Sequence, residues 1–272
     1  MSASAAAAAP IATADPAGPL LLERRERGVV HLTLNRPARF NPLSEEMLVA
    51  LQAAFDAVAG DDAARVVVLG GAGKAFCAGH DLKEMKANPQ LDYYRRLFDR
   101  CSKLMLRIQS MPQPVIARVQ GIATAAGCQL VAMCDLAVAA ADARFAVSGV
   151  NAGLFCSTPA VALSRNLGRK AAFEMLVTGD FIDASTALER GLVNRIAPPE
   201  RLDEAVAELA AAIVAKPATA IRTGKGMFYR QLEMGIAAAY QLAGQAMACN
   251  MIDESAQEGF AAFLEKRTPR WN

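Results

Sequence analysis

G-I-A-T-A-A-G-C-Q-L-V-A-M-C-D, residues 121–135, is the segment around which the chain is organised. It follows the apolar residues Pro114 to Val119, which predict a strand, and leads through small side chains into a helix that we expect to begin near Cys128. Small side chains at such a turn let another group approach the backbone. A helix N-terminus also offers unpaired N–H groups and a positive dipole end. The segment therefore indicates either an oxyanion-binding turn or close packing of helix on strand.

A second segment of similar character is G-A-G-K-A-F-C-A-G-H-D-L-K-E-M at residues 71–85, after a strand predicted at Arg65–Leu69. Together the two segments resemble the crotonase superfamily, the enoyl-CoA hydratases and isomerases. The resemblance covers nearly all of the chain after residue 20 and continues through residues 143–145, 176–180, 187–193 and 258–267. It implies an acyl-CoA thioester as partner, with the thioester oxygen held between two backbone N–H groups. Coenzyme A would be part of the substrate, and no separate cofactor and no metal are expected.

The order of predicted elements indicates an α/β fold. Apolar runs predict strands at Leu20–Arg24, Val29–Leu34, Arg65–Leu69, Pro114–Val119 and Leu136–Ala140. Helical spacing predicts helices at Ser44–Val58, Leu91–Ser110 and Cys128–Cys134. Strands that alternate with helices are typical of an α/β core. The resemblance adds a more specific arrangement, a crotonase-like spiral of ββα units.

Beyond about residue 200 the pattern becomes helical. Helices are predicted at Arg201–Ala215, Ala218–Gln231, Ile236–Asn250 and Glu254–Glu265. We therefore expect a disordered Ala/Pro-rich tail at residues 1–18, a core at 19–200 and a helical C-terminal region at 201–272. In the crotonase family this region closes over the CoA site and makes a trimer, so the resemblance implies a homotrimer or hexamer. The alternative is a helical lid on the chain's own core.

Composition excludes several other classes of function. With 29 Lys and Arg residues against 27 Asp and Glu, no basic stripe predicts nucleic-acid binding. No apolar run approaches the ~20 residues of a membrane span. The six cysteines are scattered without metal-type spacing, which favours reduced thiols. The Ala/Pro-rich tail has neither a charged n-region nor the Arg-rich character of a transit peptide, so we expect a cytoplasmic protein.

The resemblance also assigns roles to individual residues. The two oxyanion donors would be the backbone N–H groups of His80 and Ala126, where the family usually has a small residue and Gly. Contacts with CoA or the acyl group fall to Arg39, Asn41, Ala78, Asp81, Lys83, Cys156, Phe263 and Lys266. Without the resemblance, Lys83 and Lys266 would be interpreted as solvated surface lysines. Cys156 is a candidate nucleophile, but no second histidine is placed to activate it, so a packed or pocket-lining thiol is the better interpretation.

Two departures from the family pattern concern the chemistry. Enoyl-CoA hydratases use two glutamates to activate water and deliver a proton, and these positions fall on Gln129 and Gly149. Neither residue exchanges protons near neutral pH. General acid–base catalysis contributes ~10² to 10⁴ in rate, whereas each oxyanion donor contributes ~10² to 10³. We therefore expect thioester binding to be retained and hydration to be weak.

Several functions stay open at this point. The residues around His80, Gln129 and Gly149 resemble most the enoyl-CoA hydratase domain-containing protein 3 group, which is named by homology. An enzyme acting through an enolate is one hypothesis. A non-catalytic acyl-CoA binder is another, favoured by the loss of both glutamates. A third is an acyl-CoA decarboxylase-like enzyme in which His80 supplies the proton.

Overall fold

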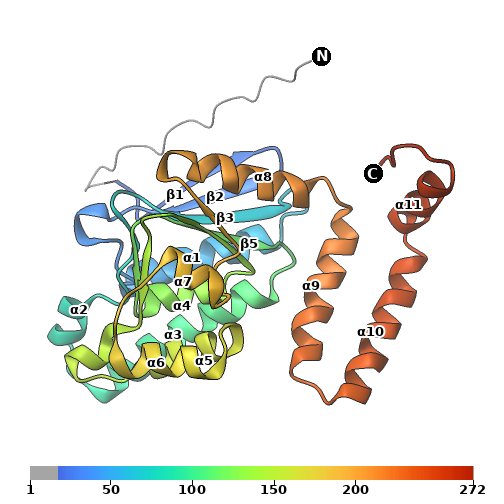
Figure 1. Cartoon of the computed structure of the whole chain (residues 1–272). Helices are drawn as coiled ribbons and strands as arrows, with labels where there is room; N and C mark the ends of the chain where they lie inside the picture. The colour runs from blue at the N-terminus through green and yellow to red at the C-terminus, as the bar shows by residue number, and fades with distance from the viewer. Residues whose placement is uncertain (1–17, 272) are drawn as a thin grey trace.

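The computed structural model describes residues 18–271, and all of the predicted disordered tail except Gly18 lies outside that range. The described chain forms two sheets flanked by helices (Figure 1). The larger sheet has the strand order β1 (Leu21–Glu26), β2 (Val29–Leu34), β3 (Val66–Gly71), β5 (Val115–Val119), β7 (Leu136–Ala140) and β10 (Arg195–Ala197). The smaller sheet has the order β4 (Ala75–Cys77), β6 (Ile122–Thr124), β8 (Arg144–Ala146) and β9 (Ile182–Asp183). The α/β fold class is confirmed.

The central strands of the larger sheet, β3, β5 and β7, are almost fully buried because they lie between two helical layers. Val67 and Leu69 of β3 join the core formed with α1 (Glu45–Ala59), α3 (Leu91–Ser110) and α4 (Ala126–Met133). Val66 and Val68 point the other way, toward α8 (Leu202–Val214). Figure 1 shows α8 on one side of the sheet and α1, α3 and α4 on the other. Such burial on both faces is typical of parallel strands.

The remaining short elements of the core connect these layers. They are η1 (Pro37–Arg39), α2 (Leu82–Ala87), η2 (Ser148–Ala152), α5 (Ser157–Asn166), α6 (Arg169–Thr178), α7 (Ala184–Glu189) and η3 (Pro199–Arg201). Helix α5 packs on α4, and α6 packs on α5 and η2. This places η2 and the start of α5 next to the helix that carries Ala126.

The last three helices, α9 (Ala218–Leu232), α10 (Ile236–Met251) and α11 (Glu254–Leu264), extend away from the sheets as an arm (Figure 1). Helix α10 has no charged residue, yet Ile236, Tyr240 and Met247 are each more than 70% exposed. Large apolar side chains exposed together on one uncharged helix are uncommon on a free monomer. By contrast, α8 packs on the larger sheet, so the predicted boundary at residue 200 separates a helix from the core on which it lies.

A buried ionic cluster holds the arm to the core. The Lys225 ammonium on α9 donates hydrogen bonds to the carbonyl oxygens of Ile108 and Gln113 at 2.8 and 2.9 Å, and to Asp135 at 2.7 Å. The Tyr229 hydroxyl donates to the other oxygen of Asp135 at 2.8 Å. Every proton of the ammonium is therefore paired, which offsets the cost of burying its charge.

Most predicted elements are confirmed, with one shift that matters for the site. The helix predicted at Cys128–Cys134 begins at Ala126, so Ala126 lies in its first turn. Ser44 caps α1 by accepting a hydrogen bond from the Met47 N–H, as its position before the helix predicts. The strands of the smaller sheet were not predicted, because segments of two or three residues give no measurable alternation.

Candidate active site

Three chain segments meet at one edge of the smaller sheet because β4, β6 and β8 run parallel, with a shift in register between Ala75 and Cys77 of β4. Cys77 pairs with Ala123, and Ala123 pairs with Phe145. The residues that follow each strand therefore leave the sheet at the same edge. They are residues 78–81 after β4, 125–129 after β6 and 147–152 after β8. The two sequence segments that first indicated an oxyanion site, and the segment that contains Gly149, are brought together by this pairing.

The backbone at this edge forms a candidate oxyanion hole. A Cβ atom on Gly79 would lie 2.9 Å from the Ala125 Cβ and 3.2 Å from the Ala126 nitrogen, so the two turns are in direct contact. A Cβ on Gly127 would lie 2.1 Å from the Cys77 carbonyl oxygen, which explains the glycine there. Within residues 18–271 we find no acceptor for the N–H groups of His80 and Ala126. Two unpaired N–H donors thus lie on adjoining turns.

The backbone of Ala125, between these two turns, is strained, and the sequence alone does not show this strain. Its backbone has φ 51° and ψ −121°, a conformation that glycine adopts easily and alanine does not. Its N–H donates to the Ala146 carbonyl at 2.9 Å, which ties the turn to β8. Strained residues of this kind cost about 1–3 kcal/mol and concentrate at functional sites.

The hydrogen bonding and burial of the His80 imidazole argue against a role as proton donor. Its Nδ1 lies 3.2 Å from the Leu43 carbonyl oxygen, and since a carbonyl only accepts, Nδ1 carries the hydrogen. Nε2 is then an unprotonated acceptor, and it is buried without a partner. The ring packs edge-to-face on Phe98 with centroids 5.6 Å apart. Burial lowers the pKa of His80 below its ordinary value, so the ring is neutral at physiological pH.

Gln129, at the first of the two positions where hydratases have a glutamate, lies on α4 one turn beyond Ala126. Only 4% of its surface is exposed, and its Oε1 atom is buried without a hydrogen-bond partner among the described residues. Leaving such an acceptor unpaired costs about 1–3 kcal/mol. The amide is therefore a group that a ligand could pair.

At Gly149 there is no room for the second carboxylate. A Cβ on this residue would lie 2.6 Å from the Cys156 sulfur and 2.6 Å from the Leu154 carbonyl oxygen. The Leu154 N–H donates to the Gly149 carbonyl at 3.0 Å, which closes this loop on itself. Cys156 is buried, and burial raises the pKa of its thiol, although the Gly149 N–H opposes this by bonding the sulfur. Cys156 is thus a packed thiol rather than a thiolate nucleophile.

Comparisons with known proteins match this geometry to one family. The model of the family described as "Enoyl-CoA hydratase/isomerase" matches residues 24–272. The chain belongs to the enoyl-CoA hydratase/isomerase family. It is 43% identical over 265 residues to "Enoyl-CoA hydratase domain-containing protein 3, mitochondrial" of Rattus norvegicus, covering 96% of this chain and 88% of the relative. The location of this chain itself stays a prediction.

Solved structures of family members agree with the fold. A crystal structure of an enoyl-CoA hydratase from Mycobacterium smegmatis has a TM-score of 0.93 at 64% identity and covers 93% of this chain and 99% of that chain. The human enoyl-CoA hydratase domain-containing protein 3 has a TM-score of 0.91 at 43% identity, with coverage of 93% and 100%. The resemblance inferred from the sequence, including the group that it favoured, is confirmed.

The residues that family resemblance assigns to CoA fall into different environments. Asp81 is buried, caps α2 by accepting from the N–H groups of Lys83 and Glu84 at 3.0 and 3.3 Å, and pairs with Arg39. Lys83 is exposed at the start of α2, whereas Ala78 is partly buried and donates its N–H to the Phe40 carbonyl at 2.9 Å. Arg39 and Lys83 therefore lie on one side of the oxyanion turn, joined through Asp81.

Asn41 cannot contact a ligand as the sequence-based assignment requires. It is fully buried, and its amide nitrogen donates to the carbonyl oxygens of Ala72, Ala75 and Phe76. Its amide oxygen accepts from the Arg36 N–H at 2.8 Å. The side chain holds the turn after η1 against β4, and this use leaves no free surface for CoA.

Phe263 and Lys266 lie on and just after α11, on the far side of the molecule from α2 (Figure 1). Phe263 is 81% exposed. One chain therefore does not bring this pair together with Arg39 and Lys83. If both sets bind CoA, they come from different copies of the chain.

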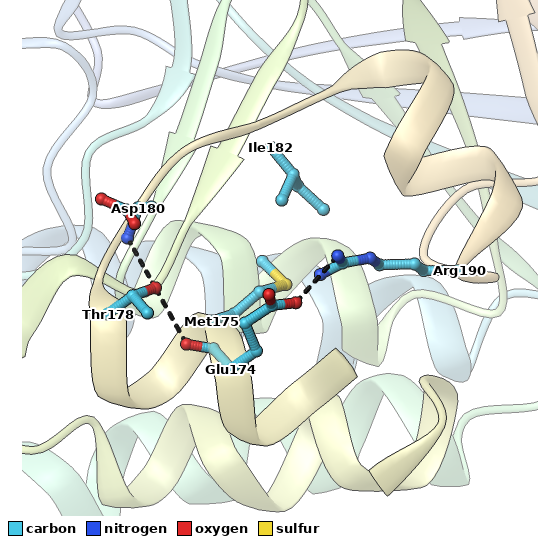
Figure 2. A pocket seen from close by; sticks show the side chains of 6 residues that line it. All are labelled: Glu174, Met175, Thr178, Asp180, Ile182 and Arg190. Atoms are coloured by element: carbon cyan, nitrogen blue, oxygen red, sulfur yellow. Dashed lines mark hydrogen bonds and ion pairs between the residues drawn. The ribbon is translucent and has the colours of Figure 1, made fainter. Parts of the chain in front are cut away.

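A small cavity and an apolar groove lie outside the candidate site. Figure 2 shows a cavity of about 110 Å³ formed by α6, β9 and α7, where Arg190 reaches Glu174 at 2.8 Å and the Thr178 hydroxyl donates to the Glu174 carbonyl. An apolar groove of about 590 Å³ runs between α5 and α6 and is lined in part by Phe155, Val161 and Phe173. In the described part of the chain, no helix is long and apolar enough to cross a membrane.

Proposed function

We propose that this chain binds acyl-CoA thioesters and polarises the thioester carbonyl with the N–H groups of His80 and Ala126. The observation that carries the proposal is the pair of unpaired N–H groups on adjoining turns, kept close by Gly79 and Gly127. Their donors are backbone groups, so the histidine and alanine side chains do not remove them. Donors fixed in advance stabilise a developing oxyanion or enolate most effectively.

Hydration of an enoyl-CoA is slow in this proposal. Addition of water needs a base to take its proton and an acid near the α-carbon. Gln129 supplies neither, and the space beside Gly149 is taken by the Cys156 sulfur and the Leu154 carbonyl. The protein is thus an acyl-CoA-binding member of the family that supports enolate-type chemistry better than hydration.

A decarboxylase-like reaction with His80 as proton donor gains no support from the geometry. The ring already gives its Nδ1 hydrogen to Leu43, and burial keeps Nε2 unprotonated. The non-catalytic binder stays as the second candidate, favoured by the closed loop at Gly149. The two candidates differ in one measurable property, whether any bound acyl-CoA leaves with a changed mass.

The assembly belongs to the same proposal. We infer a homotrimer or hexamer in which the arm of one copy closes the CoA site of another, with Arg39 and Lys83 from one chain and Phe263 and Lys266 from its neighbour. The uncharged, exposed helix α10 supports this, because burying its apolar residues needs a partner surface. The spiral arrangement of ββα units and the trimerisation role of residues 201–272 complete the proposal. Light scattering that finds a stable monomer at micromolar concentration would contradict it.

Removal of one oxyanion donor tests the function. Ala126 is the first residue of α4, a position that tolerates proline, so Ala126→Pro removes the N–H. Because a proline disfavours the φ 51° and ψ −121° of Ala125 before it, a urea midpoint equal to that of the unaltered protein must first show that the turn is kept. With crotonyl-CoA labelled with ¹³C at the thioester carbonyl, isotope-edited infrared spectroscopy should show the C=O stretch at lower frequency on binding. Ala126→Pro should lose about half of that shift and bind about fivefold more weakly.

A matched substitution controls for the proline itself. Arg169 is the first residue of α6, preceded by Gly168 with φ −58° and ψ 142°, so Arg169→Pro also removes an N–H at the first position of a helix, away from the site. Its infrared shift should equal that of the unaltered protein. No shift in the unaltered protein, or an undiminished shift in Ala126→Pro, would refute the placement of the thioester.

A further inference from the structure

The last helix of the arm, α11, has little support of its own. It is 11 residues long, and among those residues, all of which the structure describes, Ala262 alone is buried. Isolated helices shorter than ~12–15 residues are marginal in water. Asp253 caps the N-terminal end by accepting a hydrogen bond from the Ser255 N–H at 3.0 Å. The C-terminal end, which carries Phe263 and leads to Lys266, therefore depends on contacts from outside the helix.

The chain reverses direction at Lys266. The Lys266 N–H donates to the Phe263 carbonyl at 3.2 Å, and the Arg267 N–H donates to the Ala262 carbonyl at 3.0 Å. This pair of bonds ends many helices, usually with a glycine at the left-handed position. Here that position is Lys266, with φ 54°, a conformation that strains a residue with a side chain. Contacts elsewhere must hold the turn in this shape.

Residues 267–271, which we call the C-terminal strap, run back along α11 and provide the first of these contacts. The Arg267 guanidinium donates to both oxygens of the Glu258 carboxylate, at 2.6 and 2.8 Å. The Arg270 N–H donates to the same carboxylate at 2.7 Å. Paired bonds of this kind fix orientation as well as distance. The bond from Arg267 lowers the pKa of Glu258 to about 2, so the carboxylate stays charged at physiological pH.

Trp271 provides the second contact, at the other end of the strap. Its indole N–H donates to the Ala215 carbonyl at 2.9 Å. Its ring lies against α11 at Gly259, where a Cβ atom would be 3.3 Å from the ring. Ala215 ends α8, which packs on the larger sheet, and the next carbonyl, that of Lys216, accepts from the Arg65 guanidinium. The strap therefore ties α11 to a corner that belongs to the core.

We propose that Trp271 and Glu258 are positioning residues for coenzyme A, because through the strap they hold Lys266 in its left-handed turn and aim its ammonium at the phosphates. The inference rests on the proposed function, which places Lys266 of one copy against CoA bound to another. When the strap is released, only the chains that keep the turn bind CoA well, and the apparent affinity falls by that fraction. The acyl end of the ligand is unaffected, since the oxyanion turns belong to the core.

Calorimetric titration with two thioesters tests this division of the ligand. The probes are butyryl-CoA and S-butyryl-N-acetylcysteamine, which has the same acyl group and no nucleotide. Trp271→Ala should bind butyryl-CoA about tenfold more weakly, as expected if about a tenth of the chains keep the turn. Glu258→Gln should bind it about fivefold more weakly, through loss of its charged hydrogen bonds. Both variants should bind the short thioester as the unaltered protein does.

A second glutamate provides the matched control. Glu204 on α8 pairs with Arg201 at 2.8 Å on an exposed surface away from the strap, so Glu204→Gln makes the same change of charge there. It should leave both affinities unaltered. Trp271 is the only tryptophan in the sequence, so its fluorescence reports the strap alone. The emission should shift to longer wavelength in Glu258→Gln and stay unchanged in Glu204→Gln.

A double-mutant cycle separates positioning from a general loss of structure. If Trp271 acts through Lys266, Trp271→Ala combined with Lys266→Ala should bind butyryl-CoA within about twofold of the weaker single variant. Losses that multiply would overturn the inference. So would undiminished affinity in Trp271→Ala, or an equal loss with the short thioester. If Trp271→Ala does not fold, Glu258→Gln, which keeps the shape of its side chain, decides the same question. No binding of butyryl-CoA to the unaltered protein would overturn the proposed function as well.

Discussion

A methyl group added to Gly149 should destabilise the protein by about 2 kcal/mol. Its Cβ would lie 2.6 Å from the Cys156 sulfur and 2.6 Å from the Leu154 carbonyl oxygen, both far inside contact distance. The oxygen belongs to the backbone, and the Leu154 N–H bonds the Gly149 carbonyl, so the loop has to move as a unit. Forcing a methylene into closed space of this kind costs about 1–3 kcal/mol. Gly149→Glu should cost at least as much.

Urea unfolding measures this cost, with Gly60→Ala as control. Gly60 is exposed, has φ −88°, and a Cβ there would make an ordinary 3.8 Å contact with the Ala57 oxygen. Gly60→Ala should stay within about 0.5 kcal/mol of the unaltered protein. Adding Cys156→Ala to Gly149→Ala should recover part of the loss but not all, because the Leu154 oxygen remains. If the free energy of unfolding of Gly149→Ala equals that of Gly60→Ala, the claim that no carboxylate fits at position 149 is refuted.

Three further predictions concern the arm, the strained turn and pH. Lys225→Met should cost about 3–5 kcal/mol in urea unfolding, because Asp135 is left buried without its cation, and adding Asp135→Asn should recover part of it. Ala125→Gly should raise the free energy of unfolding by about 1 kcal/mol, since glycine relieves the strain at φ 51°; a loss would contradict the strain. Burial lowers the pKa of His80 below the ordinary histidine value of about 6.5. Below about that pH the unfolded chain therefore binds a proton that the folded chain does not, and stability falls. His80→Asn should flatten this decline between about pH 7 and pH 5.5, and an equally steep decline would contradict it.

The sequence predicted the parts of the fold that have long periodic patterns. The helix at Leu91–Ser110 and the strands at Val29–Leu34 and Leu136–Ala140 have the predicted bounds. Each of these elements buries one face or both, so its apolar spacing is visible in the residues alone. The short strands of the smaller sheet are stabilised by pairing with segments distant in sequence, and this pairing leaves no local pattern.

Only those parts of the candidate site that lie in recognisable sequence motifs were predicted. The sequence placed the two oxyanion turns in named residues, and β4 and β6 bring those turns together. Two features could not be predicted from the sequence. One is the backbone strain at Ala125, because an alanine gives no sign of a positive φ, and the other is the Cys156 sulfur that fills the space beside Gly149. Asn41 was misassigned because a fully buried amide and a ligand-binding amide look the same in a motif.

The most direct test of the account follows crotonyl-CoA on an excess of purified protein. We expect the thioester to be bound, as seen by its infrared shift, but to be hydrated at least about 10²-fold more slowly than by a family member that keeps both glutamates. Residual turnover that is the same in Ala126→Pro would come from a contaminating host enzyme. Hydration at the ordinary rate of a hydratase, lost in Ala126→Pro, would contradict the account and require an acid–base pair other than Gln129 and Gly149.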